Sequence, residues 1–284
     1  MTPDWLGASR AAAEALGAIL ASRPTTAERV VETGERGEGG DRTLEIDAAA
    51  EDAVFAQLER LHEAGARFTV VSEERGTVDY GGEGTLVVVD PIDGSLNAKR
   101  GMTHHALSIA VAEGPTMADV VFGFVHDLGT GEEWAAERGA GATLDGTRLD
   151  PSPRERRNRA GKLELVGIES ADPRWMRDSA DGLVDVVHRV RALGAIALSL
   201  CQVAAARLDG MTTLRGTRAV DAAAGQLIVR EAGGHVCFPA CATPLGAPLD
   251  LAPRSPVVAA RTEQGLRELA TVSRRGEAER ERRS

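Results

Sequence analysis

The sequence predicts a protein of the α/β (α+β) class, in which helices and strands pack as alternating layers. Short apolar runs typical of strands alternate along the chain with longer segments whose apolar residues recur at helical spacing. The sequence contains no internal repeat, and its 32 glycines indicate many turns between the elements. The hydrophobic and charged fractions, 43% and 27%, are ordinary for a globular protein.

Two helices and an intervening loop are expected in the first part of the chain. Residues 4–22 form an Ala- and Leu-rich amphipathic pattern that ends before Pro24. Residues 46–61 place apolar side chains on one side of a second helix. Residues 32–41 hold four glycines among charged residues, which predicts a mobile loop that is either exposed to solvent or a lid.

Four strands are expected next, followed by a turn. The strands lie at residues 68–72, 86–89, 106–112 and 120–125, and we expect the last two to pair with each other. Residues 139–148 are rich in glycine and are predicted to form turns.

A basic polar run at residues 154–158 predicts a boundary between two subdomains, 1–152 and 153–273. The charged residues 274–284 predict a disordered tail. The second subdomain is expected to hold two strands and three helices, the last of which ends at the glycines that follow it. These elements are strands at 163–168 and 187–193 and helices at 175–187, 198–208 and 222–231.

The formal net charge of −10 argues against nucleic acid and anionic membrane surfaces as partners, because like charges repel. The charge does not exclude an anionic substrate, since a bound divalent cation can reverse the local field. No stretch approaches the length of about 18 apolar residues that a membrane span needs, so none is expected.

The chain has three cysteines, an odd number, and its N-terminal residues do not show the uninterrupted apolar core of a signal peptide. We therefore expect reduced thiols and a cytoplasmic location. Cys237 and Cys241 have the spacing of half a zinc site, but no matching pair of Cys or His residues completes it.

Acidic residues lie where the apolar elements end or begin. Glu73, Asp90 and Asp93 each follow a predicted strand, while Asp47 and Asp221 each open a predicted helix. Carboxylates gathered on a partly dry surface repel one another, so they remain ionised there if a hard cation sits among them. Magnesium takes oxygen ligands, and two such ions about 3.5–4 Å apart suit displacement at phosphorus.

The segment from Asp90 to Asn97, DPIDGSLN, explains how one stretch can serve both metal and phosphate. A turn at Pro91 and Ile92 lets the two aspartates point into one site, and the carbonyl oxygen of Ile92 can be a further metal ligand. Gly94 allows close backbone approach, and Ser95 begins a short helix whose free N–H groups can bind an anion.

Each acid also has a simpler interpretation when it is taken alone. Asp47 and Asp221 can be ordinary helix caps, Glu73 can belong to a solvated turn, and Ser95 can be a cap. The spacing of the two aspartates in DPID, with two residues between them, disfavours the DxD motif of phosphatases that use an aspartate nucleophile.

Four motifs together resemble the inositol monophosphatase superfamily of magnesium-dependent, lithium-sensitive phosphatases. They are Ile46-Asp47, Ser72-Glu73-Glu74, the DPIDGSLN segment, and VDAAAGQLIVREAGG from Val220 to Gly234. The matching residues run from about position 41 to position 260. The resemblance implies the layered α-β-α-β-α sugar-phosphatase fold and a homodimer.

The resemblance also implies the metal ligands. Glu73, Asp90 and the carbonyl of Ile92 would hold one ion, and Asp90, Asp93 and Asp221 would hold a second. The implied cofactor is Mg²⁺, two or three ions for each active site, with Mn²⁺ as a possible substitute.

The remaining site residues follow from the same resemblance. Glu73, with Asp47 nearby through water, would support the third ion. Ser95, paired with Asp47, would help to orient and deprotonate the attacking water. The amides of Gly94 and Ser95 would hold the phosphate, and hydrolysis would proceed by direct attack of a metal-activated water without a phosphoenzyme.

The substrate is expected to be a small phosphorylated sugar or polyol. Inositol-specific members often have a glutamate about seven residues before the distal aspartate, but residues 213–218 hold no acid. Arg215 and Arg218 near the distal aspartate, together with Arg191, are candidates for binding a second phosphate or polar sugar groups. The segment DGSLNAKRG, together with Val220, resembles the archaeal-type branch that combines fructose-1,6-bisphosphatase and inositol monophosphatase activities.

Three alternatives stay open at this point. The first is a strict inositol-1-monophosphatase, and the second is a 3′(2′),5′-bisphosphate nucleotidase, against which the 3% of aromatic residues counts mildly. The third is a non-catalytic member of the superfamily that acts as a regulatory or protein-binding module.

Overall fold

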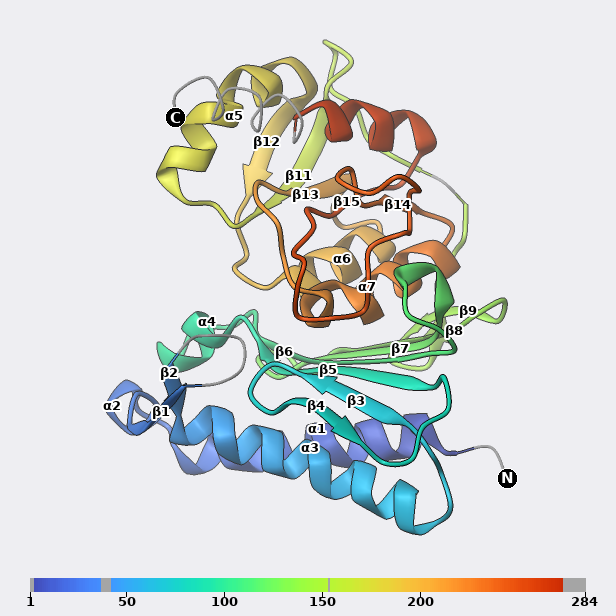
Figure 1. The fold of residues 1–284 in the computed structure, drawn as a ribbon. Coiled ribbons are helices and arrows are strands. Elements are labelled where there is room, and N and C mark those ends of the chain that lie inside the picture. The colour runs from blue at the N-terminus through green and yellow to red at the C-terminus, as the bar shows by residue number, and fades with distance from the viewer. Residues whose placement is uncertain (1–2, 37–41, 153, 273–284) are drawn as a thin grey trace.

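The protein is built of five layers, in the order α-β-α-β-α (Figure 1). The computed structural model describes residues 3–36, 42–152 and 154–272. The outer layers contain helices α1 (Trp5–Ser22) and α3 (Glu45–Glu63) on one side and α5 (Pro173–Val186) with a helix at 263–272 on the other. Helices α6 (Ile196–Ala204) and α7 (Ala219–Glu231) lie between the two sheets. The layered fold that the motifs implied is confirmed.

The first sheet has eight strands in the order β10-β9-β8-β7-β6-β5-β3-β4, and all neighbours are antiparallel except β3 and β5. Its strands are β3 (Thr69–Ser72), β4 (Gly76–Asp79), β5 (Leu86–Asp93), β6 (Ala106–Ala112), β7 (Val120–Asp127), β8 (Glu133–Glu137), β9 (Gly141–Leu144) and β10 (Thr147–Arg148). The pairing of β5 with β6 shifts register between Asp90 and Asp93. This irregularity lies where the DPID segment leaves the sheet.

The second sheet has five strands in the order β12-β11-β13-β15-β14, and β11 is parallel to both of its neighbours. Its strands are β11 (Leu163–Glu169), β12 (Val187–Arg191), β13 (Gly210–Thr213), β14 (His235–Cys237) and β15 (Val258–Ala260). The two sheets thus draw on different halves of the chain. Helix α7, however, packs on β6 and β7 of the first sheet, so the division into subdomains 1–152 and 153–273 stays a prediction.

Small elements complete the structure. They are α2 (Thr26–Arg29), α4 (Ser95–Lys99), the 3₁₀ helix η1 (Met117–Asp119) and a hairpin of β1 (Glu32–Arg36) with β2 (Arg42–Leu44). The loop predicted over 32–41 is therefore wrong for residues 32–36, which pair with β2. Residues 37–41 and the tail 274–284 lie outside the described residues.

The turn predicted over 139–148 is also wrong in part, because it contains the hairpin of β9 and β10. Asp145 and Gly146 form its turn, with φ angles of 49° and 73°. Left-handed conformations at both central positions match the twist of two paired strands, which is why an Asp-Gly pair favours a hairpin. The glycine-rich segment therefore contains a turn that joins two neighbouring strands of the first sheet. The predicted pairing of residues 106–112 with 120–125 is confirmed.

Strand β5 belongs to two cores at once. Val88 packs in the core between the first sheet and α7, whereas Val87 and Val89 pack in the core under α1 and α3. Successive side chains of a strand point to opposite faces, so an uninterrupted apolar run fits a strand buried on both faces. This central strand ends at the aspartates of the DPID segment.

Helix α7 lies close against the first sheet. A Cβ atom at Gly123 of β7 would lie 2.8 Å from the carbonyl oxygen of Ala224, and the helix presents Ala222 and Ala223 in the same core. Small residues on both surfaces therefore permit the contact. Most of α7 is buried between the two sheets.

Within the described ranges, no helix is long and apolar enough to cross a membrane.

Arg261 ties together the ends of the two middle helices. It is 1% exposed, and its Nη1 atom donates to the carbonyls of Ala204, at the end of α6, and Ala232, just after α7, each at 3.1 Å. Its Nη2 atom donates to the carbonyl of Ser152 at 3.0 Å. A cation at the C-terminal ends of helices is electrostatically favourable. Arg261 therefore fixes the C-terminal ends of both helices.

Replacing Arg261 with Met should lower the free energy of unfolding by about 2–4 kcal/mol, because buried carbonyls lose their donor while most of the side-chain volume remains. Urea unfolding followed by circular dichroism measures this loss. The matched control is Arg267→Met, since Arg267 is exposed and, among the described residues, pairs across a helical turn with Glu263. The control should change stability by less than about 0.5 kcal/mol. Equal losses in both variants would contradict the structural role given to Arg261.

Candidate active site

A cavity of about 490 Å³ lies where the first sheet, the middle helices and the end of β11 meet. Among its lining residues are five acids and three arginines: Glu73, Asp90, Asp93, Glu169, Asp221, Arg215, Arg218 and Arg254. A second cavity, of about 400 Å³, shares a wall with it. The residues that line both cavities are Glu73, Asp90, Ile92 and Ser95.

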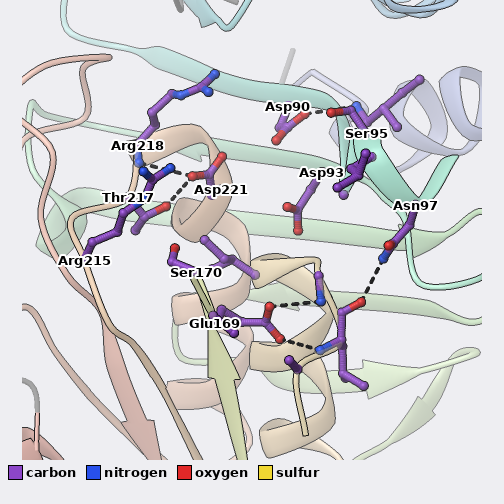
Figure 2. A pocket seen from close by; sticks show the side chains of 18 of the residues that line it. Asp90, Asp93, Ser95, Asn97, Glu169, Ser170, Arg215, Thr217, Arg218 and Asp221 are labelled. Atoms are coloured by element: carbon purple, nitrogen blue, oxygen red, sulfur yellow. Dashed lines mark hydrogen bonds between the residues drawn. The ribbon is translucent and has the colours of Figure 1, made fainter. Parts of the chain in front are cut away.

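Three carboxylates of the shared region come within metal-binding range of one another. Oxygen atoms of Glu73, Asp90 and Asp221 all lie within 4.8 Å of each other. They come from the turn after β3, from β5 and from the first turn of α7. Figure 2 shows Asp90, Asp93 and Asp221 pointing into one space. A donor set made only of carboxylate oxygens fits a hard divalent cation.

The two aspartates of the DPID segment are deeply buried, with 3% of Asp90 and 6% of Asp93 exposed. Burial raises the pKa of Asp90 well above its ordinary value, and the charges of Glu73 and Asp93 raise it further. Burial and the charge of Asp221 likewise raise the pKa of Asp93. Both groups therefore resist ionisation unless positive charge is supplied.

Backbone donors hold these aspartates in place. The amide of Ile92 donates to Asp90 Oδ1 at 3.0 Å, which closes the turn within the segment. The amide of Ala197, at the start of α6, donates to Asp93 Oδ2 at 2.6 Å. The N-terminal end of a helix carries partial positive charge, so α6 stabilises the ionised form of Asp93. Ile92 itself lines both cavities.

Arg218 forms an ion pair with Glu73 at the edge of the cluster. Burial raises the pKa of Glu73, and the guanidinium opposes that effect. Burial alone would lower the pKa of Arg218, but the charges of Glu73, Asp221 and Asp90 outweigh it and raise the pKa. Arg218 therefore lines the cavity as a neutralising partner of the acids, in addition to any contact with substrate.

Asp221 is the third residue of α7, and Arg218 is the residue that precedes the helix. The hydroxyl of Thr217 donates to its Oδ2 atom, and the amide of Arg218 donates to the same atom at 3.1 Å. Asp221 is therefore the acid at the third helical position of a capping box, and the capping position itself is Arg218. The alternative that Asp221 is an ordinary N-terminal cap is wrong, although its carboxylate does contact the helix start.

Asp47 occupies the equivalent position in α3 and lines the second cavity with Ser95 and Lys99. Its Oδ2 atom lies 3.4 Å from the amide of Leu44 and 3.4 Å from Lys99 Nζ. Beyond the residues it shares with the larger cavity, the second cavity therefore adds two acids, Asp47 and Glu74, and the ammonium group of Lys99. Sequence reasoning linked Asp47 with Ser95 but did not expect the ion pair with Lys99.

The turn at Gly94 requires glycine. Gly94 has a φ angle of 83°, and a Cβ atom there would lie 2.8 Å from the carbonyl oxygen of His104 and 3.0 Å from Ala195 Cβ. The short helix α4 begins at the next residue, Ser95. Asn97 of this helix donates from Nδ2 to the carbonyls of His104 and Leu193, both at 2.8 Å.

Arg191 is the predicted residue that the structure leaves outside the cavities. It lies at the end of β12, its side chain is exposed, and its Nη1 atom donates to the carbonyl of the preceding residue, Val190. It lines neither cavity. The remaining predicted residues all line one or both cavities: Asp47, Glu73, Asp90, Ile92, Asp93, Gly94, Ser95, Arg215, Arg218 and Asp221.

Sequence reasoning missed Glu169, and it did not single out Arg254. Glu169 had a usable signal, because it ends an apolar strand in the same way as Asp90 does. Arg254 had none, since it follows a proline in an irregular segment. Two antiparallel backbone hydrogen bonds of 3.0 Å between Thr217 and Ser255 bring its segment beside residues 215–218.

The five-layer fold and the carboxylate cluster fit a phosphomonoesterase of the sugar-phosphatase type, and comparison with known proteins supports that class. The inositol monophosphatase family model matches residues 4–276, so the chain belongs to the inositol monophosphatase family. The superfamily resemblance carried by the motifs is thereby confirmed.

Two curated relatives are fructose-1,6-bisphosphatase/inositol-1-monophosphatases from archaea. The chain is 41% identical over 201 residues to that of Thermococcus kodakarensis, covering 69% of this chain and 70% of the relative. It is 36% identical over 211 residues to that of Methanothermobacter thermautotrophicus, covering 70% and 72%. A solved inositol monophosphatase-fructose 1,6 bisphosphatase superposes with a TM-score of 0.79 at 25% identity, covering 95% of this chain and 99% of that one.

Replacing Asp90 with Asn should stabilise the metal-free protein near neutral pH. A carboxyl whose folded pKa is raised above its unfolded value binds more protons in the folded state, so stability falls as pH rises between the two values. The wild-type protein should therefore lose melting temperature between about pH 5.5 and about pH 7.5 in a chelating buffer, and the variant should lose less. Differential scanning calorimetry at both pH values measures the effect.

The control for this measurement is Asp52→Asn, since Asp52 is exposed and its partner is Arg75 outside the cluster. The control should follow the wild-type pH dependence. A lower melting temperature of Asp90→Asn at both pH values would show that the carboxylates do not repel one another in the metal-free protein.

Proposed function

We propose that the protein is a divalent-metal-dependent phosphatase that hydrolyses fructose-1,6-bisphosphate, inositol-1-phosphate or both, and that it acts as a homodimer. The observation that carries the proposal is the cluster of Glu73, Asp90 and Asp221, which opens into the same cavity as the turn at Gly94. A metal-binding cluster beside a group of backbone amides suits a phosphate ester, whose negative charge both can bind.

The acids in this site fit Mg²⁺, with Mn²⁺ as a substitute. Glu73, Asp90 and the carbonyl of Ile92 would hold one ion, while Asp93 and Asp221 would complete a second site with Asp90. The raised pKa values of Asp90 and Asp93 support this assignment, because bound cations would offset both the burial and the repulsion that raise them. When bound, divalent cations lower the pKa of a coordinated water and stabilise a leaving alkoxide.

The protein groups would hold the reactants in line. The amides of Gly94 and Ser95 would bind the phosphate oxygens, and the larger cavity would receive the sugar or polyol. Ser95 and Asp47 would orient the attacking water and accept its proton from the side of the second cavity. The bond from water oxygen to phosphorus forms as the ester bond breaks, and the alcohol leaves after taking up a proton from solvent.

Arg215 and Arg254 support a substrate with a second phosphate. Both line the larger cavity, and within the described residues neither is part of an ion pair. A Cβ atom at Gly216 would lie 3.1 Å from three atoms of Arg254, so the two segments are in close contact. Guanidinium groups bind phosphate through paired charge-assisted hydrogen bonds. We therefore assign the second phosphate to these arginines in place of Arg191.

A phosphate-release assay with and without Mg²⁺ tests the proposal. The panel consists of fructose-1,6-bisphosphate, inositol-1-phosphate and adenosine 3′,5′-bisphosphate. We expect release from one or both of the first two substrates, loss of release in chelator, and a decrease of kcat by at least about 100-fold in a folded Asp93→Asn variant. Asp52→Asn should retain wild-type kcat.

Other outcomes select the alternatives. Release from inositol-1-phosphate alone indicates the strict monophosphatase, and release from the adenosine compound alone indicates the nucleotidase. No release from any substrate, or a near-normal kcat in Asp93→Asn, overturns the proposal and favours a non-catalytic role.

Substitution of the two arginines tests the second-phosphate site. Arg215→Ala and Arg254→Ala should each raise KM for fructose-1,6-bisphosphate about tenfold, the effect of losing about 1.4 kcal/mol of binding to a charged group. KM for inositol-1-phosphate should stay within about twofold, because that substrate has one phosphate. Arg191→Ala is the matched control and should change neither value. An effect of Arg191→Ala alone would return the second phosphate to Arg191.

A further inference from the structure

Glu169 is a buried acid in the wall of the larger cavity that the proposed mechanism does not use. It is the last residue of β11 and is 2% exposed. Burial raises the pKa of its carboxyl, and hydrogen bonds to Ser199, Leu193 and Gly194 oppose this effect. An acid is costly at such a position unless its oxygens serve as acceptors.

Both carboxylate oxygens of Glu169 bind the turn that leads into α6. Its Oε1 atom accepts from the amide of Leu193 at 3.0 Å and from Ser199 Oγ at 2.6 Å. Its Oε2 atom accepts from the amide of Gly194 at 3.0 Å. Figure 2 shows the carboxylate bridging these two consecutive amides. A two-point attachment of this kind fixes the orientation of the turn as well as its distance from β11.

The turn at residues 192–195 supports the turn at Gly94. Asn97 Nδ2 donates to the carbonyl of Leu193 at 2.8 Å. A Cβ atom at Gly94 would lie 3.0 Å from the carbonyl oxygen of Gly194, and a Cβ atom at Gly194 would lie 2.8 Å from Asn97 Nδ2. The two turns are thus in contact, and a shift of one displaces the other.

The same turn also sets the start of α6. Ala197, four residues after Leu193, donates its amide to Asp93 Oδ2 at 2.6 Å. A turn released from Glu169 would therefore lose its fixed relation to Asp93 as well as to Gly94.

We propose that Glu169 is a positioning residue of the active site, which holds the turn at residues 192–195 against both Gly94 and Asp93. The proposal rests on the proposed function, since it assigns Gly94 to phosphate and Asp93 to metal. Glu169 acts through the turn and does not itself touch the reacting atoms.

Glu169→Gln tests this role, because an amide group replaces one oxygen and sets an N–H donor against a backbone donor. We expect kcat for phosphate release to fall about tenfold or more, with a smaller change in KM, since the reacting groups lose alignment in the bound complex. The matched control is Asp209→Asn. Asp209 is equally buried, accepts from the amides of Arg156 at 2.7 Å and Leu165 at 3.0 Å, and lies outside both cavities.

The control should lower the melting temperature but leave kcat and KM within about twofold of wild type. A Glu169→Gln variant that loses only melting temperature, as Asp209→Asn does, would reduce Glu169 to a structural acid. If Glu169→Gln does not fold, Ser199→Ala replaces it in every measurement, because it removes one of the three donors and spares the backbone.

Hydrogen exchange of the metal-free protein gives a readout that does not depend on activity. The amides of Leu193, Gly194 and Ala197 should exchange faster in Glu169→Gln and at the wild-type rate in Asp209→Asn. Unchanged exchange at all three amides overturns the proposal. A wild-type protein that releases no phosphate would refute the proposed function, whereas the exchange data would still decide whether Glu169 holds the turn.

Discussion

The structure depends on the repulsion among carboxylates where the two sheets approach each other. Asp90 and Asp93 are buried beside Asp221, and burial and the neighbouring charges raise the pKa of both carboxyls although backbone donors oppose the effect. The surrounding layers keep them there, since β5 is buried on both faces and α7 packs tightly on its neighbours. The buried carboxylates therefore lower the stability of the metal-free protein at this place, and a bound divalent cation would offset that loss.

The two helices of the middle layer contact the acids of the site at one end and a buried arginine at the other. Helices α6 and α7 direct their N-termini to the cleft, where they meet Asp93 and Asp221, and their C-termini to Arg261. The partial positive charge of the helix starts therefore favours the ionised acids, while the guanidinium group favours the opposite ends. Each helix is held by opposite charges at its two ends. The acids of the site and the buried arginine are in this sense parts of one arrangement.

The sequence predicts those parts of the site whose residues lie close together along the chain. Asp90 and Asp93 share one short segment, so their convergence follows from a single turn, and the five layers follow from the family motifs. Contacts between distant segments could not be predicted in the same way. Arg218 and Glu73 are 145 positions apart by number, and only the packing of α7 on the first sheet brings them together.

The same limit explains the particular errors. Arg191 and Arg254 are both arginines near turns in the sequence, but β12 directs one away from the cleft while the Thr217–Ser255 pairing brings the other to it. Glycine content was a weak guide for residues 32–36 and 141–148, because hairpins need glycines as much as loops do. A high glycine content indicates that the chain turns. Whether the turn joins two paired strands or belongs to a loop depends on whether the flanking residues pair with each other.

The residues shared by the two cavities have a consequence for how water and alcohol would enter and leave the site. Glu73, Asp90, Ile92 and Ser95 line both the cavity that contains Asp47 and Lys99 and the cavity that contains the arginines. In an in-line displacement the incoming and departing oxygens lie on opposite sides of phosphorus. Under the proposed mechanism, the attacking water would lie in the cavity of Asp47 and Lys99, and the departing alcohol would lie in the cavity of the arginines. The next water could then reach phosphorus from its own side while the alcohol is still bound.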